Sequence, residues 1–153
     1  MNIGSTPLTL VRDIISSLNI DESDSILDPF YRQGEFFHEF RNKFAFFTEI
    51  EMGFDFFDHN KRVDWIISNP PLNGIERILE KSADLCIKGF GYILFFNELN
   101  ANIVDNLEKR GFFITKLSII NINSWNHNYS LCFVLWEKNK KSKDINFLKN
   151  IFF

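Results

Sequence analysis

The stretch that decides the fold is Val63-Asp64-Trp65-Ile66-Ile67-Ser68-Asn69-Pro70-Pro71-Leu72. Its first six residues are rich in β-branched and aromatic side chains, which predicts a buried strand over 63–68. Asn69-Pro70-Pro71 ends that strand, because proline lacks a backbone donor and holds the preceding residue in extended geometry. Two consecutive prolines directly after a buried strand predict a rigid corner at its carboxyl end, which a simple turn does not need.

Helical and strand patterns alternate on both sides of this corner. Apolar spacing predicts helices over 8–18, 34–42, 75–87 and 103–109, the third of them closed by Gly89 and Gly91. Apolar runs predict strands over 26–28, 44–50 and 92–96, and a final pair over 112–122 and 129–136. The polar segment 123–128, with Trp125, joins that pair as an antiparallel hairpin.

This alternation predicts an α/β architecture, a Rossmann-like three-layer αβα sandwich with a mostly parallel sheet and a C-terminal antiparallel hairpin. At 153 residues the whole chain, 1–153, is expected to form a single domain. Ligands in such sheets bind beyond the carboxyl ends of the strands. The candidate site residues should therefore directly follow the strands.

Composition limits the class of protein. No basic stretch precedes an apolar core and no apolar run approaches about 18 residues, so we expect a soluble, cytoplasmic protein without a membrane span. Cys86 and Cys132 lie in apolar runs without ligand spacing, which favours reduced core thiols over a metal site. The net charge of −3 does not indicate a polyanion binder, and the basic run 138–143 is more typical of a solvated end.

A carboxylate at a strand end begins the first candidate site. Asp28-Pro29-Phe30 leads through Gly34 towards the second predicted helix. A turn that presents backbone N–H groups beside an acid suits a ligand with both an ammonium and a carboxylate group. The same residues could equally be a plain joint between a strand and a helix, and Thr6-Pro7, taken alone, is a helix start.

Two further acids follow the next strand. Glu49, with Ile50 after it, lies where a carboxylate can accept hydrogen bonds from both ribose hydroxyls. Asp55 could accept from an adenine amino group, beside a stacking ring of Phe56 or Phe57. The alternative interpretation is a pair of exposed acids in a turn.

The Asn69 corner suits the activation of a planar amine. The exocyclic amine of adenine is a poor nucleophile, because its lone pair is delocalised into the ring. The carboxamide oxygen of Asn69 and the carbonyl of Pro70 can accept its two hydrogens and direct the lone pair at a methyl group. Neutral acceptors avoid a tight ion pair with a sulfonium donor, and a rigid corner lowers the entropic cost of alignment.

In their order, these motifs resemble the class I S-adenosylmethionine-dependent methyltransferases, and among them the DNA adenine-N6 methyltransferases with an Asn-Pro-Pro-Tyr/Phe motif. The resemblance covers roughly residues 4–137. It implies that S-adenosylmethionine is the cofactor and that nucleic acid is the partner, DNA before RNA. It implies a cofactor-binding set of Thr6, Pro7, Asp28, Pro29, Phe30, Gly34, Glu49, Ile50, Asp55 and Phe56, and a catalytic set of Asn69, Pro70, Pro71 and Leu72.

The sequence departs from that family at two places. Arg32 stands where the family usually has a second glycine, and Leu72 stands where it has an aromatic ring that stacks on the target base. No segment is long enough for a separate target-recognition domain, so a protein partner, or a loop that the sequence does not identify, would supply recognition. Two other interpretations stay open: an RNA or protein-glutamine methyltransferase, and a catalytically degenerate methyltransferase-fold binding subunit.

Overall fold

The computed structural model describes residues 5–121, 130–142 and 145. Within these residues the chain forms a six-stranded sheet in the order β2-β1-β3-β4-β6-β5. The strands are β1 (Ser25–Asp28), β2 (Phe44–Phe47), β3 (Val63–Ser68), β4 (Cys86–Phe95), β5 (Phe112–Ile120) and β6 (Leu131–Lys138). The first four strands pair in parallel, and β6 lies antiparallel between β4 and β5. The predicted mostly parallel sheet with its C-terminal hairpin is confirmed.

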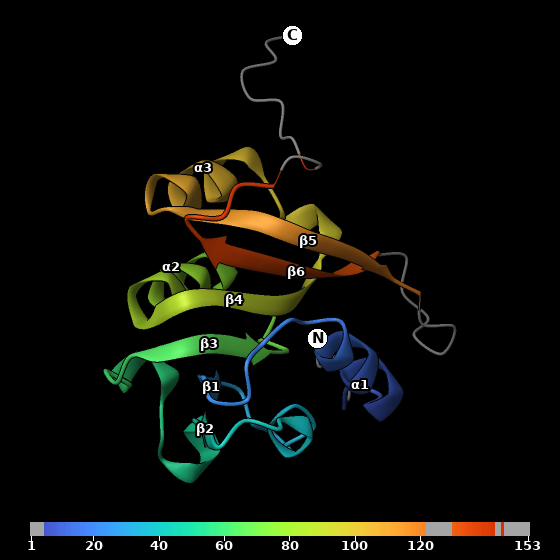
Figure 1. Ribbon diagram of the computed structural model, residues 1–153, viewed down its shortest axis with the longest axis vertical. Coiled ribbons are helices and arrows are strands. Elements are labelled where there is room, and N and C mark those ends of the chain that lie inside the picture. Colours follow the sequence, from blue (N-terminus) through green and yellow to red (C-terminus); the bar gives the residue numbers. More distant parts are fainter. Residues whose placement is uncertain (1–4, 122–129, 143–144, 146–153) are drawn as a thin grey trace, which may run out of the picture.

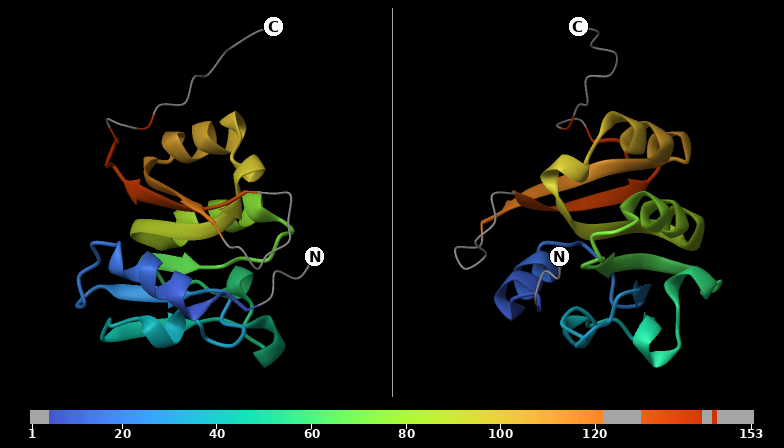
Figure 2. Two further views of the ribbon diagram at one scale, coloured as in Figure 1. Left: turned by 90° about the vertical axis from the view of Figure 1, so that its right-hand side faces the viewer. Right: turned by 180° about the vertical axis from the view of Figure 1, so that it is seen from behind.

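Helices cover both faces of this sheet (Figures 1 and 2). Helix α1 (Leu8–Ser16) lies on one face, where Val11 and Ile14 join a buried cluster with Ile67 and Phe133. Helices α2 (Ile75–Leu85) and α3 (Ala101–Lys109) lie on the other, over a second cluster that contains Phe90 and Trp136. Both clusters are apolar, so burial of these side chains is the main force that holds the three layers together. No helix in the described part of the chain is long and apolar enough to cross a membrane.

The helix predicted over 34–42 is wrong. Only a single 3-10 turn, η1 (Phe37–Glu39), forms there. Phe36 is buried in the cluster under α1, whereas the ring of Phe37 lies 5.1 Å from that of Phe47. Phe36 and Phe37 therefore pack in different directions, and the face that the spacing predicted for Phe36, Phe37 and Phe40 does not exist.

The predicted end of the third helix is also wrong. Helix α2 stops at Leu85, and β4 begins at the next residue, so Gly89 and Gly91 lie inside a strand and close no helix. A Cβ on Gly91 would come within 2.5 Å of the Phe133 ring, and one on Gly89 would overlap the carbonyl oxygen of Trp136. The two glycines are needed because neighbouring atoms occupy the space of a side chain.

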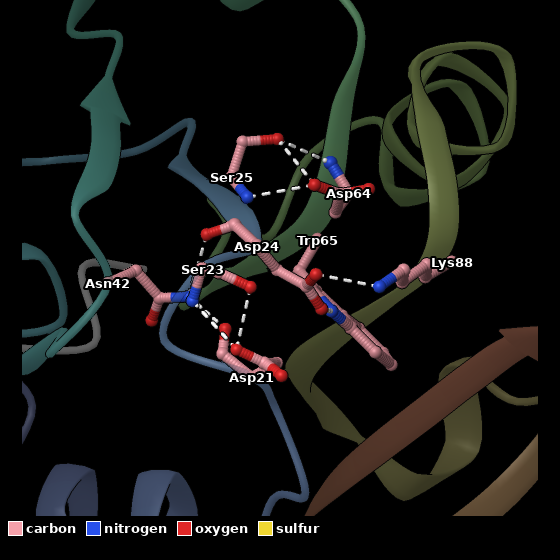
Figure 3. A network of polar contacts seen from close by, with 8 residues as sticks. All are labelled: Asp21, Ser23, Asp24, Ser25, Asn42, Asp64, Trp65 and Lys88. Atoms are coloured by element: carbon pink, nitrogen blue, oxygen red, sulfur yellow. Dashed lines mark hydrogen bonds and ion pairs between the residues drawn. The ribbon is translucent and has the colours of Figure 1, made fainter.

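A polar network fastens the amino ends of β1, β3 and β4, at the edge opposite the candidate site (Figure 3). Asp24 is 8% exposed, and its carboxylate accepts hydrogen bonds from Trp65 Nε1 at 2.8 Å and Lys88 Nζ at 2.6 Å. Asp64 accepts from the backbone N–H of Ser25 at 2.8 Å. These bonds link neighbouring strands, so they help to fix the register that brings the opposite strand ends together.

Candidate functional site

The carboxyl ends of β2, β1 and β3 meet at one edge of the sheet, with β1 in the middle. Asp28 is the last residue of β1, Glu49 follows β2 by two residues, and Asn69 follows β3 directly. The hydroxyl of Ser68 donates to Asp28 Oδ1 at 2.5 Å, which joins β1 to β3. The sheet order therefore brings together three residues that the sequence separates by as many as 41 positions.

Asp28 is almost completely buried, with 1% of its surface exposed. Burial raises the pKa of this carboxyl to about 6, although hydrogen bonds from Ser68 and from the backbone N–H of Phe30 favour its ionised form. A nearby negative charge on Glu35 raises the pKa further. A buried acid that titrates close to neutral pH responds strongly to a cation placed beside it.

The loop after Asp28 has the left-handed backbone that a glycine loop requires. Gly34 has φ +80°, and a Cβ there would lie 2.6 Å from the ring of His38. Arg32 also lies in the left-handed region, with φ +49°. For a residue other than glycine this conformation costs about 1–2 kcal/mol, which is the penalty expected of an arginine at this place.

Glu49 contacts this loop directly. Its carboxylate accepts from the backbone N–H of Arg32 at 2.6 Å and from that of Glu51 at 3.3 Å. A carboxylate has about four acceptor positions, so both oxygens of Glu49 can accept further hydrogen bonds. Ile50, the next residue, is 68% exposed and offers an apolar surface beside them.

The segment with Asp55 and Phe56 packs against the same loop. Asp55 accepts from the backbone N–H of Phe57 at 2.9 Å and caps the short turn η3 (Phe56–Asp58). Phe56 is 2% exposed, and its ring lies 5.5 Å from that of Phe30. Phe56 is thus a core residue that supports the loop. Phe57 is partly exposed, and the guanidinium of Arg77 lies over its ring, 4.7 Å from the centroid.

Asn69 is held on one side only. Its Nδ2 donates to the hydroxyl of Thr6 at 3.0 Å, and both residues are about 95% buried. Its Oδ1 is covered and has no hydrogen-bond partner among the described residues. A buried carbonyl oxygen without a partner is uncommon in folded proteins, so this atom is a candidate for a ligand contact.

The three residues that follow Asn69 in this corner differ in their exposure. Pro70 is buried and Pro71 is exposed, while Leu72 is partly buried and packs against the cluster under α1. Leu72 therefore contributes to the core on one side and offers a small apolar surface on the other. The segment 122–129, which contains Trp125, lies outside the described residues.

Three cavities lie on the face covered by α1. One of about 630 Å³ lies between α1 and the carboxyl end of β5, and its lining includes Pro7, Ile119 and Phe133. Another of about 500 Å³ lies beside Arg12 and Phe40, and the third, of about 430 Å³, beside Lys116 and Lys141. Asp28 and Asn69 line none of these three, so a ligand at Asn69 Oδ1 requires a local movement of the atoms that cover it.

Two contacts at the site were missed by sequence reasoning. The sequence pattern indicates for Ser68 only a place at the end of a strand, whereas its hydroxyl donates to Asp28. Thr48 also escaped notice, and its hydroxyl donates to the carbonyl of Pro29 at 2.8 Å. Each follows from strand pairing, which places residues of different strands side by side in a way that no local pattern reveals.

Known proteins were compared with this chain by sequence and by structure. No protein-family model and no curated protein matches the sequence. The fold is similar to that of a protein of Pyrococcus horikoshii proposed to be an RNA methyltransferase, with 18% identity, a TM-score of 0.68, and coverage of 86% of this chain and 82% of the other.

Two further structures have the same arrangement. Magnesium protoporphyrin IX methyltransferase of Synechocystis, with bound S-adenosylmethionine, has 12% identity, a TM-score of 0.65, and coverage of 85% and 76%. The tRNA m1G37 methyltransferase of M. jannaschii has 14% identity, a TM-score of 0.66, and coverage of 90% and 52%, so this chain spans about half of it. The chain therefore has the fold of the class I S-adenosylmethionine-dependent methyltransferases.

Proposed function

We propose that this protein is an S-adenosylmethionine-dependent N-methyltransferase that transfers a methyl group to the exocyclic amine of adenine in DNA. The observation that carries the proposal is the buried Oδ1 of Asn69 at the end of β3, which has no hydrogen-bond partner in the part of the chain that the structure describes. An oxygen in this state can accept a hydrogen bond from an N–H or O–H group. An amine with two hydrogens is the substrate that can use this oxygen together with a second carbonyl, that of Pro70.

The residues around Asp28 fit the methyl donor. Asp28 would pair with the ammonium of its methionine part, and the loop at Arg32 to Gly34 would offer backbone N–H groups to its carboxylate. Glu49 would accept hydrogen bonds from the ribose hydroxyls, and Ile50 and Phe57 would pack against the adenine. The bound donor supplies an electrophilic methyl group on a sulfonium.

Asn69 and Pro70 would prepare the nucleophile. The Asn69 oxygen accepts one amine hydrogen and the Pro70 carbonyl accepts the other, which draws the nitrogen towards tetrahedral geometry. The new N–C bond forms as the S–C bond breaks, and the extra proton leaves from the methylated nitrogen to solvent. The neutral corner acts by position and polarity, which is effective where water is excluded.

The residues around Asn69 offer few of the contacts that bind a nucleic acid. Leu72 offers no π-face to a target base, which an aromatic ring would stabilise by about 1–3 kcal/mol. The cavity beside Pro7 is lined by apolar side chains such as Ile119 and Phe133 and by polar ones such as Asp13 and Asn121, and its volume lies within the usual range for a ligand pocket. We therefore place the target base near this cavity and assign recognition of the surrounding sequence to a protein partner.

RNA is the second candidate acceptor. Two of the structurally similar proteins are named for RNA or tRNA methylation. The corner at Asn69 contacts only the amine in this proposal, so it does not distinguish deoxyribose from ribose. A comparison of the two nucleic acids is therefore part of the test.

The test is transfer of a labelled methyl group from S-adenosylmethionine to unmethylated DNA, to unmodified tRNA and to whole-cell protein. We expect label in adenine of DNA, and nuclease digestion followed by mass spectrometry identifies the N6-methylated base. Asn69→Ala should lower transfer by at least about 100-fold, the usual loss for one transition-state contact of this kind, while donor affinity stays within a factor of about two.

Asn102→Ala is the matched control, because Asn102 is an exposed asparagine in the first turn of α3, away from the site. It should transfer methyl groups like the wild type. If only tRNA is labelled, the acceptor is RNA instead of DNA, and the proposed methyl transfer to an amine still stands. Binding of the donor without transfer to any of the three acceptors would refute the proposal and favour a binding subunit.

A further inference from the structure

Thr6 touches the candidate reaction centre. Its hydroxyl accepts a hydrogen bond from Asn69 Nδ2 at 3.0 Å, and the side chain is 5% exposed. Thr6 immediately precedes Pro7, the N-cap residue of α1, and the helix start has no side-chain cap hydrogen bond. The hydroxyl is therefore not used to cap the helix, as a threonine before a helix often is.

The orientation of the Asn69 carboxamide decides what this corner can bind. Rotation by half a turn about the last side-chain bond exchanges Oδ1 and Nδ2. With Nδ2 on Thr6, one N–H is paired and the oxygen is left for a ligand. In the reverse orientation the Thr6 hydroxyl would donate to Oδ1, and the carboxamide would present only N–H groups, which cannot accept a hydrogen from an amine.

We propose that Thr6 is a positioning residue for the methyl transfer: it holds the Asn69 carboxamide with its oxygen turned to the acceptor amine. This inference rests on the proposed function. It moves Thr6 from the donor-binding set, where the sequence had placed it, to the acceptor side of the site. The start of α1 is thereby coupled to the end of β3 through one hydrogen bond.

Two substitutions separate this role from donor binding. Thr6→Val keeps the shape and removes the hydroxyl, whereas Thr6→Ser keeps the hydroxyl. We expect Thr6→Val to lower kcat about tenfold, as loss of one orienting hydrogen bond would, with the Kd for S-adenosylmethionine unchanged within a factor of about two. Thr6→Ser should keep kcat within about threefold of the wild type.

A spectroscopic measurement reports the orientation directly. The side-chain NH₂ pair of Asn69 is identified in ¹⁵N-correlated NMR spectra as the pair that Asn69→Ala removes. In the wild type and in Thr6→Ser, one proton of the pair should be shifted downfield and protected from exchange. In Thr6→Val both protons should exchange alike, and thermal unfolding shows that each variant remains folded.

The outcomes are distinct. A Thr6→Val variant that transfers methyl groups at the wild-type rate, or that loses donor affinity with kcat unchanged, overturns the positioning role and leaves the proposed function standing. A wild type that transfers no methyl group to adenine-containing DNA or tRNA overturns the proposed function, and the positioning role with it. Lower kcat in Thr6→Val, rescue in Thr6→Ser and the loss of NMR protection together support it.

Discussion

Replacement of Asp28 by asparagine should remove a pH-dependent cost from the folded state. Burial raises the pKa of Asp28 from 3.8 to about 6. Between these values the unfolded chain has released the proton while the folded chain still holds it, so stability falls as pH rises. Above pH 6 both states are ionised, and the full cost is present.

The size of this cost follows from the shift. One pKa unit corresponds to 1.36 kcal/mol, so a shift of about two units lowers the free energy of unfolding by about 3 kcal/mol between about pH 4 and pH 7. Asparagine does not titrate, and its Oδ1 can still accept from the Ser68 hydroxyl and from the backbone N–H of Phe30. The free energy of unfolding of Asp28→Asn should therefore increase relative to that of the wild type as pH rises.

Urea unfolding at several pH values between about 4 and 7.5 measures this difference. Other titrating groups are shared by the two proteins and largely cancel. We expect the free energy of unfolding of Asp28→Asn minus that of the wild type to rise by about 3 kcal/mol across this range, mostly between pH 4 and pH 6. A difference that stays level, or that falls with pH, would refute the assignment of a raised pKa to Asp28.

Further predictions concern the donor, the sheet and the polar network. Because the donor ammonium pairs with ionised Asp28, the affinity for S-adenosylmethionine measured by calorimetry should fall up to about tenfold per pH unit below about pH 6, and a level profile would exclude this pairing. Gly89→Ala should lower the free energy of unfolding by about 1–3 kcal/mol because its Cβ would meet the Trp136 carbonyl, and more than Gly53→Ala, whose Cβ has open space around it despite φ +85°. Asp24→Ala should lower the free energy of unfolding by about 3 kcal/mol, because Trp65 Nε1 stays buried without an acceptor. Asp58→Ala, at an exposed position in η3, should change that free energy, measured by chemical denaturation, by less than about 0.5 kcal/mol.

The sequence predicted the strand edge of the site well. Strand β3 and its Asn69-Pro70-Pro71 end were found because a dense apolar run followed by two prolines has few other interpretations. The grouping of Asp28, Glu49 and Asn69 followed from the rule that parallel strands present their carboxyl ends at one edge. Periodicity and turn chemistry were therefore sufficient where they agreed.

Prediction from the sequence was wrong or incomplete where contacts between distant residues determine the structure. The helix predicted over 34–42 rested on the spacing of Phe36, Phe37 and Phe40, yet Phe37 packs against Phe47, whereas Phe36 and Phe40 pack against the cluster under α1. Gly89 and Gly91 were interpreted as helix ends, although the nearby atoms of Trp136 and Phe133 are what exclude a side chain there. The bond between Thr6 and Asn69 joins residues 63 positions apart, and no local pattern indicates such a contact.

The most direct test of the central claim follows Asn69 through donor binding and methyl transfer in the same preparations. Calorimetric titration of S-adenosylmethionine, carried to about 1 mM at the upper end of usual enzyme KM values, is run beside the labelled transfer to adenine-containing DNA and tRNA. We predict that the wild type and Asn69→Ala bind the donor equally and that only the wild type transfers the methyl group. Absence of binding by the wild type, or equal transfer by Asn69→Ala, would contradict the account.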